Sequence, residues 1–122
     1  MTRTKLMQGN RGEDAAVSYL RRLGIQIIGR NFRIRGGEID IIGIDRTASN
    51  GVAVLVFYEV KTRSSEQFGT PFEAITYWKV KTLIKAAQFY ILKHPNLPET
   101  LRIDAIAVTC NQAGEVINLD LV

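Results

Sequence analysis

Phe57-Tyr58-Glu59-Val60-Lys61 closes an apolar run that begins at Val52 and predicts a buried β-strand over residues 52–62. Side chains alternate between the two faces of a strand, so Glu59 and Lys61 emerge on the same side. Charges at the end of an apolar strand are costly unless they are paired, hydrated or bound to a metal ion. This stretch therefore predicts a central strand of the fold and, at its end, a candidate site.

Size and composition predict one globular domain that spans residues 1–122. Hydrophobic residues make up 46% of the chain and charged residues 23%, which argues against the disordered and fibrous classes. The formal net charge of +4 is compatible with a polyanionic partner, although by itself it is only a weak indication of one.

Several features of the chain indicate a cytoplasmic protein. Cys110 is the only cysteine, so no internal disulfide can form, and its apolar neighbours predict a buried thiol rather than a nucleophile. Residues 1–9 are expected to form a flexible leader without the apolar segment of a signal peptide. The longest apolar run is far shorter than the roughly 20 residues needed to span a bilayer, so we expect no membrane partner.

Hydrophobic periodicity and turn residues predict two helices and five strands. The expected elements are a helix over residues 13–23, strands over 25–34, 38–44 and 52–62, a helix over 72–93, and strands over 102–110 and 115–121. Gly24 is expected to cap the first helix, and Asn50-Gly51 to mark a turn before the central strand. The order α-β-β-β-α-β-β predicts an α/β domain whose mixed β-sheet is flanked by helices.

A second strand with acidic residues lies just upstream, in Gly37-Glu38-Ile39-Asp40-Ile41-Ile42. Ile39 and Ile41 are expected to share the face that packs on the core, which leaves Asp40 on the opposite face. If this strand is the antiparallel partner of the central strand, Asp40 lies across from Glu59 or diagonal to it.

Two close carboxylates repel each other, so a cation is expected between Asp40 and Glu59, either Lys61 or a divalent metal ion. Oxygen ligands from a few carboxylates suit Mg²⁺ or Mn²⁺. Glu13 adds a third acid, because its helical spacing places it on the inward stripe of the first helix. The alternative is an exposed ladder of ion pairs among these residues and Arg63, which contributes little energy.

The expected helix over residues 72–93 combines basic and aromatic side chains. Its lysines include Lys79, Lys81 and Lys85. These lysines follow DNA phosphates if their face borders the site, and otherwise they form a solvated face. Tyr77 and Trp78 carry rings that can stack on bases, but the expected place of Trp78 on the apolar stripe favours packing in the core or in a dimer.

Four blocks of the sequence together resemble one family. They are Gly12-Glu13, Gly37-Glu38-Ile39-Asp40, Glu59-Val60-Lys61-Thr62-Arg63 and Phe68-Gly69. On these blocks the chain is identified as a member of the YraN-like, endonuclease-like family. That family is similar to the archaeal Holliday junction resolvases of the PD-(D/E)XK nuclease superfamily. The resemblance covers about residues 12–104 and implies a restriction-endonuclease-like core of three layers.

The resemblance implies a role for each matching residue. Asp40 and Glu59 resemble the metal ligands of the superfamily, with the Val60 carbonyl as a third ligand. Lys61 resembles the catalytic lysine, and Glu13 resembles the helix acid that completes the metal or water shell. The implied function is a DNA endonuclease that depends on Mg²⁺ or Mn²⁺ and acts on branched DNA such as Holliday junctions.

Other residues add to or depart from this pattern. Ile39 stands where the superfamily name has a proline, which is often absent among relatives. Arg63 and the helix lysines are expected to contact DNA. Arg102 and Asp104 also match a family pattern, although we expect them to form a structural ion pair near the end of the sheet.

Two other classes of function remain open from the sequence. One is a nucleic-acid-binding module that keeps the nuclease fold but does not cut, and the other is a protein-interaction domain whose acidic cluster is only structural. Similarity to junction resolvases also suggests a homodimer, because symmetric substrates are commonly met by symmetric dimers.

Overall fold

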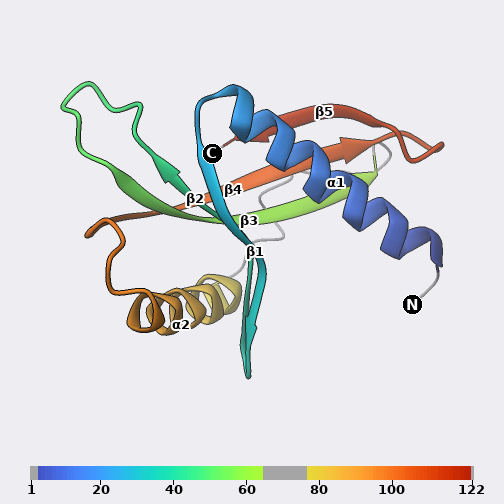
Figure 1. The fold of residues 1–122 in the computed structure, drawn as a ribbon. Helices are drawn as coiled ribbons and strands as arrows, with labels where there is room; N and C mark the ends of the chain where they lie inside the picture. The colour runs from blue at the N-terminus through green and yellow to red at the C-terminus, as the bar shows by residue number, and fades with distance from the viewer. Residues whose placement is uncertain (1–2, 65–76, 122) are drawn as a thin grey trace.

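The computed structural model describes residues 3–64 and 77–121, with the backbone alone for residues 3–11. The elements are α1 Arg3–Arg22, β1 Gln26–Ile34, β2 Gly37–Asp45, β3 Val54–Ser64, α2 Tyr77–Lys93, β4 Thr100–Cys110 and β5 Val116–Leu121 (Figure 1). Their order matches the order expected from the sequence. The first residues of the expected second helix, 72–76, lie outside the described residues, as does the Phe68-Gly69 block.

The described strands form one mixed sheet in the order β1-β2-β3-β4-β5. The only parallel pair in it joins β3 to β4, and the other neighbours are antiparallel. Parallel neighbours need a long crossover connection, and α2 lies in the segment that joins β3 to β4. The expected α/β fold with a mixed sheet and two helices is therefore confirmed.

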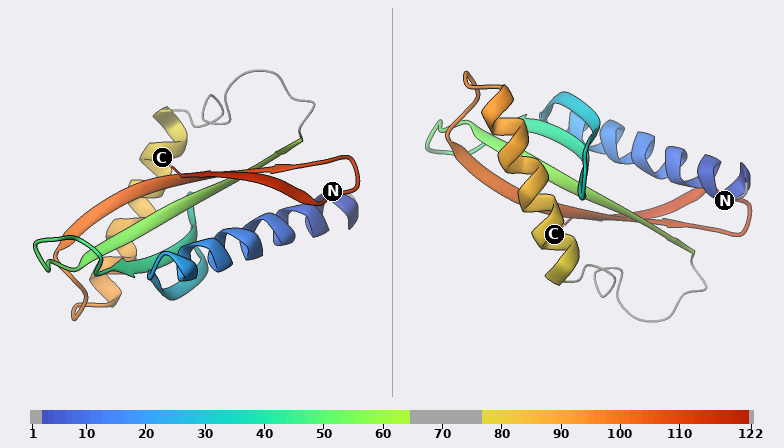
Figure 2. Two further views of the ribbon diagram at one scale, coloured as in Figure 1. Left: turned by 90° about the horizontal axis from the view of Figure 1, so that it is seen from above. Right: turned by 90° about the horizontal axis from the view of Figure 1, so that it is seen from below.

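The two helices cover opposite faces of the sheet, as Figures 1 and 2 show. Val56 and Tyr58 of β3 pack in the core cluster that contains the buried residues of α1. Leu55 and Phe57 pack in the second cluster, together with the buried residues of α2. Continued alternation puts Glu59 on the α2 side of the sheet. The central strand is apolar on both faces because each face is covered by a helix.

Helix α1 begins at Arg3, so the expected helix start at residue 13 is wrong. Residues 3–9 of the expected flexible leader have helical backbone, and the flexibility of residues 1–9 stays a prediction. Gly12 suggests a break in the sequence, but here it allows a close contact, because a Cβ added there would overlap the Thr62 hydroxyl oxygen. Glu13 therefore lies inside a helix, where the dipole of a helix start cannot explain an acid. The expected cap is confirmed, since Gly24 follows the helix with a φ of 90°.

The sheet forks between β2 and β3. These strands pair only from Ile41–Tyr58 to Asp45–Val54, after which β2 remains paired with β1 and β3 with β4. The β1–β2 hairpin consequently leaves the sheet beside α2 (Figure 1). Ile39 packs in the α2 cluster, whereas Ile41 packs in the α1 cluster. The expectation that both share one core face is wrong, because the hairpin leaves the plane of the sheet between them.

Gly37, at the start of β2, makes a close contact with α2. A Cβ at Gly37 would lie 2.5 Å from the Thr82 carbonyl oxygen, which is backbone and cannot swing aside. We expect Gly37→Ala to lower the free energy of unfolding by about 1–3 kcal/mol, as overpacking does. Chemical denaturation measures the change. Gly29→Ala is the matched control, since its added Cβ would meet its nearest neighbour at an ordinary 3.5 Å. Equal stability of the two variants would contradict the contact.

The inward stripe of α2 differs from the expected one at its N-terminal end. Its buried residues are Leu83, Ala86, Ala87 and Tyr90. Residues four apart share a helix face, so the residue that continues this stripe one turn before Leu83 is Lys79. Trp78, which was expected on the stripe, lies off it. Trp78 is 70% exposed, so the first of its two expected settings, packing in the core, is wrong, while packing in a dimer stays a prediction. Neither described helix is long and apolar enough to cross a membrane.

Candidate functional site

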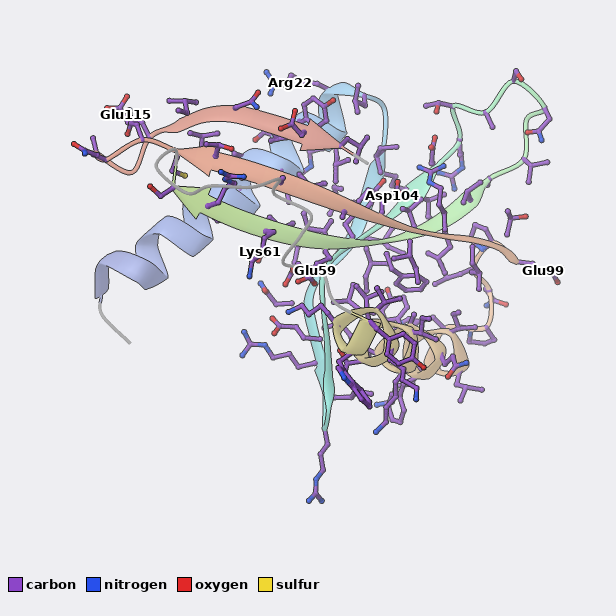
Figure 3. The ribbon with its side chains drawn as sticks, turned by 180° about the vertical axis from the view of Figure 1, so that it is seen from behind. Arg22, Glu59, Lys61, Glu99, Asp104 and Glu115 are labelled. Carbon is purple, nitrogen blue, oxygen red and sulfur yellow. The ribbon has the colours of Figure 1, made fainter. Side chains whose placement is uncertain are left out.

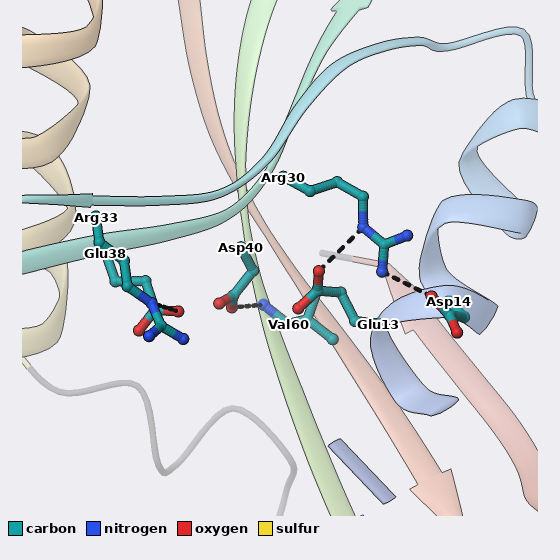
Figure 4. Close-up of polar contacts among 7 residues, drawn as sticks. All are labelled: Glu13, Asp14, Arg30, Arg33, Glu38, Asp40 and Val60. Atoms are coloured by element: carbon teal, nitrogen blue, oxygen red, sulfur yellow. Dashed lines mark hydrogen bonds and ion pairs between the residues drawn. The ribbon is translucent and has the colours of Figure 1, made fainter. Parts of the chain in front are cut away.

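Asp40 occupies the fork between β2 and β3. The pairing of β2 with β3 ends at Ile41 and Tyr58. Asp40 on β2 and Glu59 on β3 are the next residues beyond that pair, at the point where the two strands separate. The Oδ2 atom of Asp40 accepts a hydrogen bond of 2.7 Å from the Val60 backbone N–H (Figure 4). The side chain of Asp40 thus replaces the missing strand partner. In an extended strand the N–H and C=O of one residue point to the same side, so the Val60 carbonyl also faces this fork.

The carboxyl group of Asp40 is held in a strongly unfavourable place for a negative charge. Its pKa is raised from an ordinary value of 3.8 to about 7. Burial is the largest cause of this rise, and the nearby carboxylate of Glu59 is the next. The hydrogen bond from Val60 opposes these effects and Glu38 adds to them. Among the described residues no lysine or arginine forms an ion pair with Asp40. Electrostatically, this position favours a proton or an added cation.

Glu59 has a partner that the sequence did not indicate. Its side chain is only 7% exposed, and its Oε1 lies 3.0 Å from the Nζ atom of Lys79. The hydrogen bond to Glu59 raises the pKa of Lys79, which keeps the lysine charged. Lys79 was expected to contact DNA on the outside of the helix. Lys79 lies four residues before Leu83, which is buried. This helical spacing is the signal that could have predicted an inward position for Lys79, next to Glu59.

Glu13 reaches the fork from α1 on the other side of the sheet. Figure 4 shows Glu13 and Asp40 directed toward the same stretch of β3. Burial raises the pKa of Glu13 despite its partner Arg30, and the nearby Asp40 adds to the rise. Arg30 Nε lies 3.1 Å from Glu13 Oε1, and its Nη2 lies 2.7 Å from Asp14 Oδ1. Asp40 of β2 therefore acts electrostatically on Glu13 of α1, and Glu59 of β3 acts on Asp40.

Arg30 is a site residue that sequence reasoning missed. It pairs across the strands with Ile41, the residue after Asp40. The next residue, Asn31, has a φ of 52°, which asparagine tolerates better than most residues, and its side chain hydrogen-bonds to Glu13. An asparagine inside a run that otherwise predicts a strand was the available signal for an irregularity next to the site.

Lys61 and Arg63 continue along β3 beyond Glu59. Figure 3 shows Glu59 and Lys61 emerging on the same side of the strand, as their spacing predicts. Lys61 is half-buried. Arg63 follows at the next position of the same face and is also half-buried.

Lys81 and Lys85 lie outside the acidic cluster. The Nζ atom of Lys81 is 5.5 Å from the ring centroids of both Tyr77 and Trp78. Lys85 extends toward the β1–β2 turn, where its Nζ atom would lie 3.4 Å from a Cβ added at Gly36. Both lysines belong to the exposed face of α2, so only Lys79 of the three helix lysines takes part in the fork.

The donor atoms at the fork suit a hard divalent cation with few protein ligands. The described residues contain no group of three or more His, Cys, Asp or Glu side chains placed to hold a metal ion. Mg²⁺ commonly binds through one or two carboxylates and keeps several waters. Asp40 and Glu59, with the Val60 carbonyl on the same edge, fit that smaller requirement, and an added cation would offset the repulsion felt by Asp40.

Comparison with known sequences places these residues in a family. The profile described as "Uncharacterised protein family UPF0102" matches residues 12–108. The chain belongs to this family. A UPF0102 protein of Persephonella marina is 44% identical over 112 residues, which are 92% of this chain and 91% of the relative. A UPF0102 protein of Caldicellulosiruptor saccharolyticus is 40% identical over 114 residues, 93% of this chain and 92% of the relative.

The UPF0102 match extends to another relative and includes all of the candidate site. The UPF0102 protein GSU0650 of Geobacter sulfurreducens is 45% identical over 101 residues, which cover 83% of this chain and 74% of that protein. Residues 12–108 run from the start of the Gly12-Glu13 block into β4, whereas β5 lies beyond them. The three acids and Lys61 are therefore part of the segment that this chain shares with UPF0102.

A second charged cluster of the UPF0102 chain lies at the other end of β3 and is structural. Arg102 Nε lies 2.9 Å from Asp104 Oδ2, and Arg102 Nη2 lies 3.0 Å from Asp45 Oδ2. The expected ion pair of Arg102 and Asp104 is confirmed. Thr47 also donates to Asp45, and these bonds lower the pKa of Asp45. Here the acids are satisfied by the protein itself, in contrast to Asp40.

Proposed function

We propose that this member of UPF0102 is a metal-dependent DNA endonuclease with a restriction-endonuclease-like core. The convergence of Glu13, Asp40 and Glu59 from three different elements on one fork carries the proposal. Lys61 follows Glu59 on the same face of β3, which adds a cation near the acids. The resemblance to junction resolvases suggests branched DNA as the substrate.

Each group at the fork has a defined task in this proposal. Asp40 and Glu59 would hold Mg²⁺ or Mn²⁺, with the Val60 carbonyl as a further oxygen ligand. When bound, such an ion lowers the pKa of a water molecule and neutralises charge on the phosphate. Lys61 positions the attacking water and stabilises the developing charge. Glu13 orients water from the α1 side, and Arg30 holds the Glu13 carboxylate in place.

Cleavage of DNA of several shapes tests the proposal. We expect the purified chain to cut four-way junctions or flapped duplexes with Mg²⁺ or Mn²⁺, and to cut nothing in excess EDTA. Linear duplex of the same sequence is the control for branch preference. Products are resolved on denaturing gels after incubation over a range of protein concentrations. The absence of cleavage with every substrate and both metals would overturn the endonuclease proposal.

A DNA-binding module without catalysis is the second candidate, and one observation favours it. Lys79 already neutralises Glu59, and Arg30 already contacts Glu13, so a proton on Asp40 is enough to satisfy the cluster. Titration calorimetry with Mn²⁺ separates the two candidates. Heat of binding that disappears in Asp40→Asn supports the nuclease. Salt-dependent DNA binding without any heat from Mn²⁺ supports the module.

We also propose that the chain acts as a homodimer on such substrates, since a two-fold junction suits a two-fold protein. Light scattering coupled to size-exclusion chromatography, with and without a four-way junction, measures the mass directly. A mass of one chain per junction would contradict the dimer.

A further inference from the structure

The first turn of α2 exposes two adjacent aromatic rings. Tyr77 and Trp78 are 69% and 70% exposed, respectively. Their ring centroids are 5.6 Å apart in an edge-to-face arrangement, which holds the two rings together without burying either. Two adjacent exposed aromatic rings form a contiguous apolar patch, and such patches on a protein surface commonly mark binding sites.

The surroundings of these rings are basic. The amine of Lys81 lies 5.5 Å from both ring centroids. The helix Tyr77–Lys93 carries lysines at four positions and contains neither aspartate nor glutamate. An open hollow of about 450 Å³ lies beside Trp78, and its lining includes Lys81, Lys85 and Gly36. We call Tyr77, Trp78, Lys81 and Lys85 the aromatic platform.

The aromatic platform is adjacent in sequence to a residue that contacts the fork. Lys79 follows Trp78 directly and bonds to Glu59. The first turn of α2 therefore carries the exposed rings on one side and Lys79, which contacts the fork, on another.

We propose that the aromatic platform binds unpaired bases of single-stranded DNA, with Trp78 and Tyr77 stacking on the bases and Lys81 and Lys85 contacting phosphates. Stacking needs the open face of a base, which a continuous duplex does not offer but a branch point or flap does. This inference rests on the proposed function and narrows its substrate to DNA that carries an unpaired segment near the cleavage position.

Charge favours DNA over a second copy of the chain at this surface. A two-fold interface brings the same patch of both copies together. Such an interface would set the lysines of one platform against the lysines of the other, and α2 offers no acid to neutralise them. A polyanion instead gains favourable contacts from each lysine.

Intrinsic fluorescence gives a direct test, because Trp78 is the only tryptophan of the chain. The protein is titrated with an oligothymidylate of about 12 nucleotides, within the usual site size, in EDTA so that no cleavage occurs. We expect saturable quenching of the Trp78 emission that weakens as salt is added. A blunt duplex of equal length should quench much less. Equal quenching by both, or none by the single strand, would overturn the platform.

Three variants connect the signal to binding. With a labelled oligothymidylate and anisotropy as the readout, Trp78→Ala should weaken affinity roughly tenfold to a hundredfold, as loss of a stacked base does. Trp78→Phe should recover most of it, since a ring remains. Phe89→Ala is the matched control, because Phe89 is also exposed and lies 4.9 Å from a lysine amine, that of Lys93, three turns along the helix. Unchanged affinity in Trp78→Ala would contradict the proposal.

The outcomes separate the platform from the nuclease and from a dimer. Quenching by the single strand without cleavage by any metal would retain the platform and remove the endonuclease. Cleavage of branched DNA at the same rate and affinity in Trp78→Ala would remove the platform and retain the endonuclease. Blue-shifted emission that depends on protein concentration and not on DNA would assign the surface to a second copy and overturn the proposal.

Discussion

Lys61→Ala is expected to lower the single-turnover rate of DNA cleavage by about 10²–10⁴-fold, the usual contribution of a group that moves or holds a proton in the transition state. Lys61 emerges on the same face of β3 as Glu59, beside the fork that holds Asp40 (Figure 3). Because the side chain is half-buried and belongs to neither core cluster, its loss should leave the fold intact. Rates are measured with branched DNA at saturating protein and saturating Mg²⁺.

A matched lysine distinguishes chemistry from general charge. Lys93→Ala removes one exposed lysine at the far end of α2 and should cut at nearly the wild-type rate. Saturating protein removes any effect on DNA affinity, so a lower rate in Lys61→Ala alone reports the cleavage step. If the two variants cut equally fast, Lys61 has no catalytic role and the assignment of this fork as the active centre is wrong.

Asp40→Asn is expected to stabilise the metal-free protein at alkaline pH by about 2–4 kcal/mol. The pKa of Asp40 is raised to about 7, mainly by burial and then by Glu59, from an ordinary 3.8 in the unfolded chain. An asparagine has the shape of the protonated acid and still accepts the hydrogen bond from the Val60 N–H. Denaturation by urea in EDTA, at pH values from 4 to 9, measures the free energy of unfolding of both proteins.

The direction of the effect follows from where the proton is held. Between about pH 4 and pH 7 the folded protein keeps a proton on Asp40 that the unfolded chain releases, so the wild-type protein loses stability as pH rises. The groups that face Asp40 are Glu59 on β3, Glu38 on β2 and Glu13 on α1, with Lys79 of α2 bonded to Glu59. The lysine reduces the loss but does not reverse it.

Two comparisons make this prediction decisive. Asp120→Asn, on the exposed strand β5, removes a similar charge and should change stability little at any pH. If Asp40 is a metal ligand as proposed, adding Mg²⁺ at pH 8 should stabilise the wild-type protein much more than Asp40→Asn, which lacks one of the two proposed carboxylate ligands. A constant difference between wild type and Asp40→Asn from pH 4 to pH 9 would show that burial does not retain a proton on Asp40.

Local sequence patterns were sufficient for the type and order of the elements. The apolar run before Glu59 predicts a strand that is buried on both faces, and the structure packs Leu55 and Phe57 on one side and Val56 and Tyr58 on the other. The alternation of two residues also predicts the shared face of Glu59 and Lys61. These properties follow from strand geometry and need no knowledge of the partners.

Contacts between distant segments account for what the sequence did not predict. Gly12 suggests a helix boundary, yet it lies within α1 because the helix backbone approaches Thr62. Lys79 appears to be one of several solvated lysines until Leu83 is known to be buried, which turns Lys79 toward Glu59. Arg30 had no indication of a role, because its partners Glu13 and Asp14 are 17 and 16 residues away.

The sequence by itself determined an α/β chain with a central strand that ends in Glu59 and Lys61, and an acidic strand beside it. The reason is that hydrophobic periodicity and turn residues act locally. Only the tertiary structure decided that the sheet forks at Asp40, that Lys79 rather than Lys61 forms the ion pair with Glu59, and that Trp78 is exposed. Those outcomes depend on how α2 packs against the β1–β2 hairpin, which is a property of non-local packing and burial.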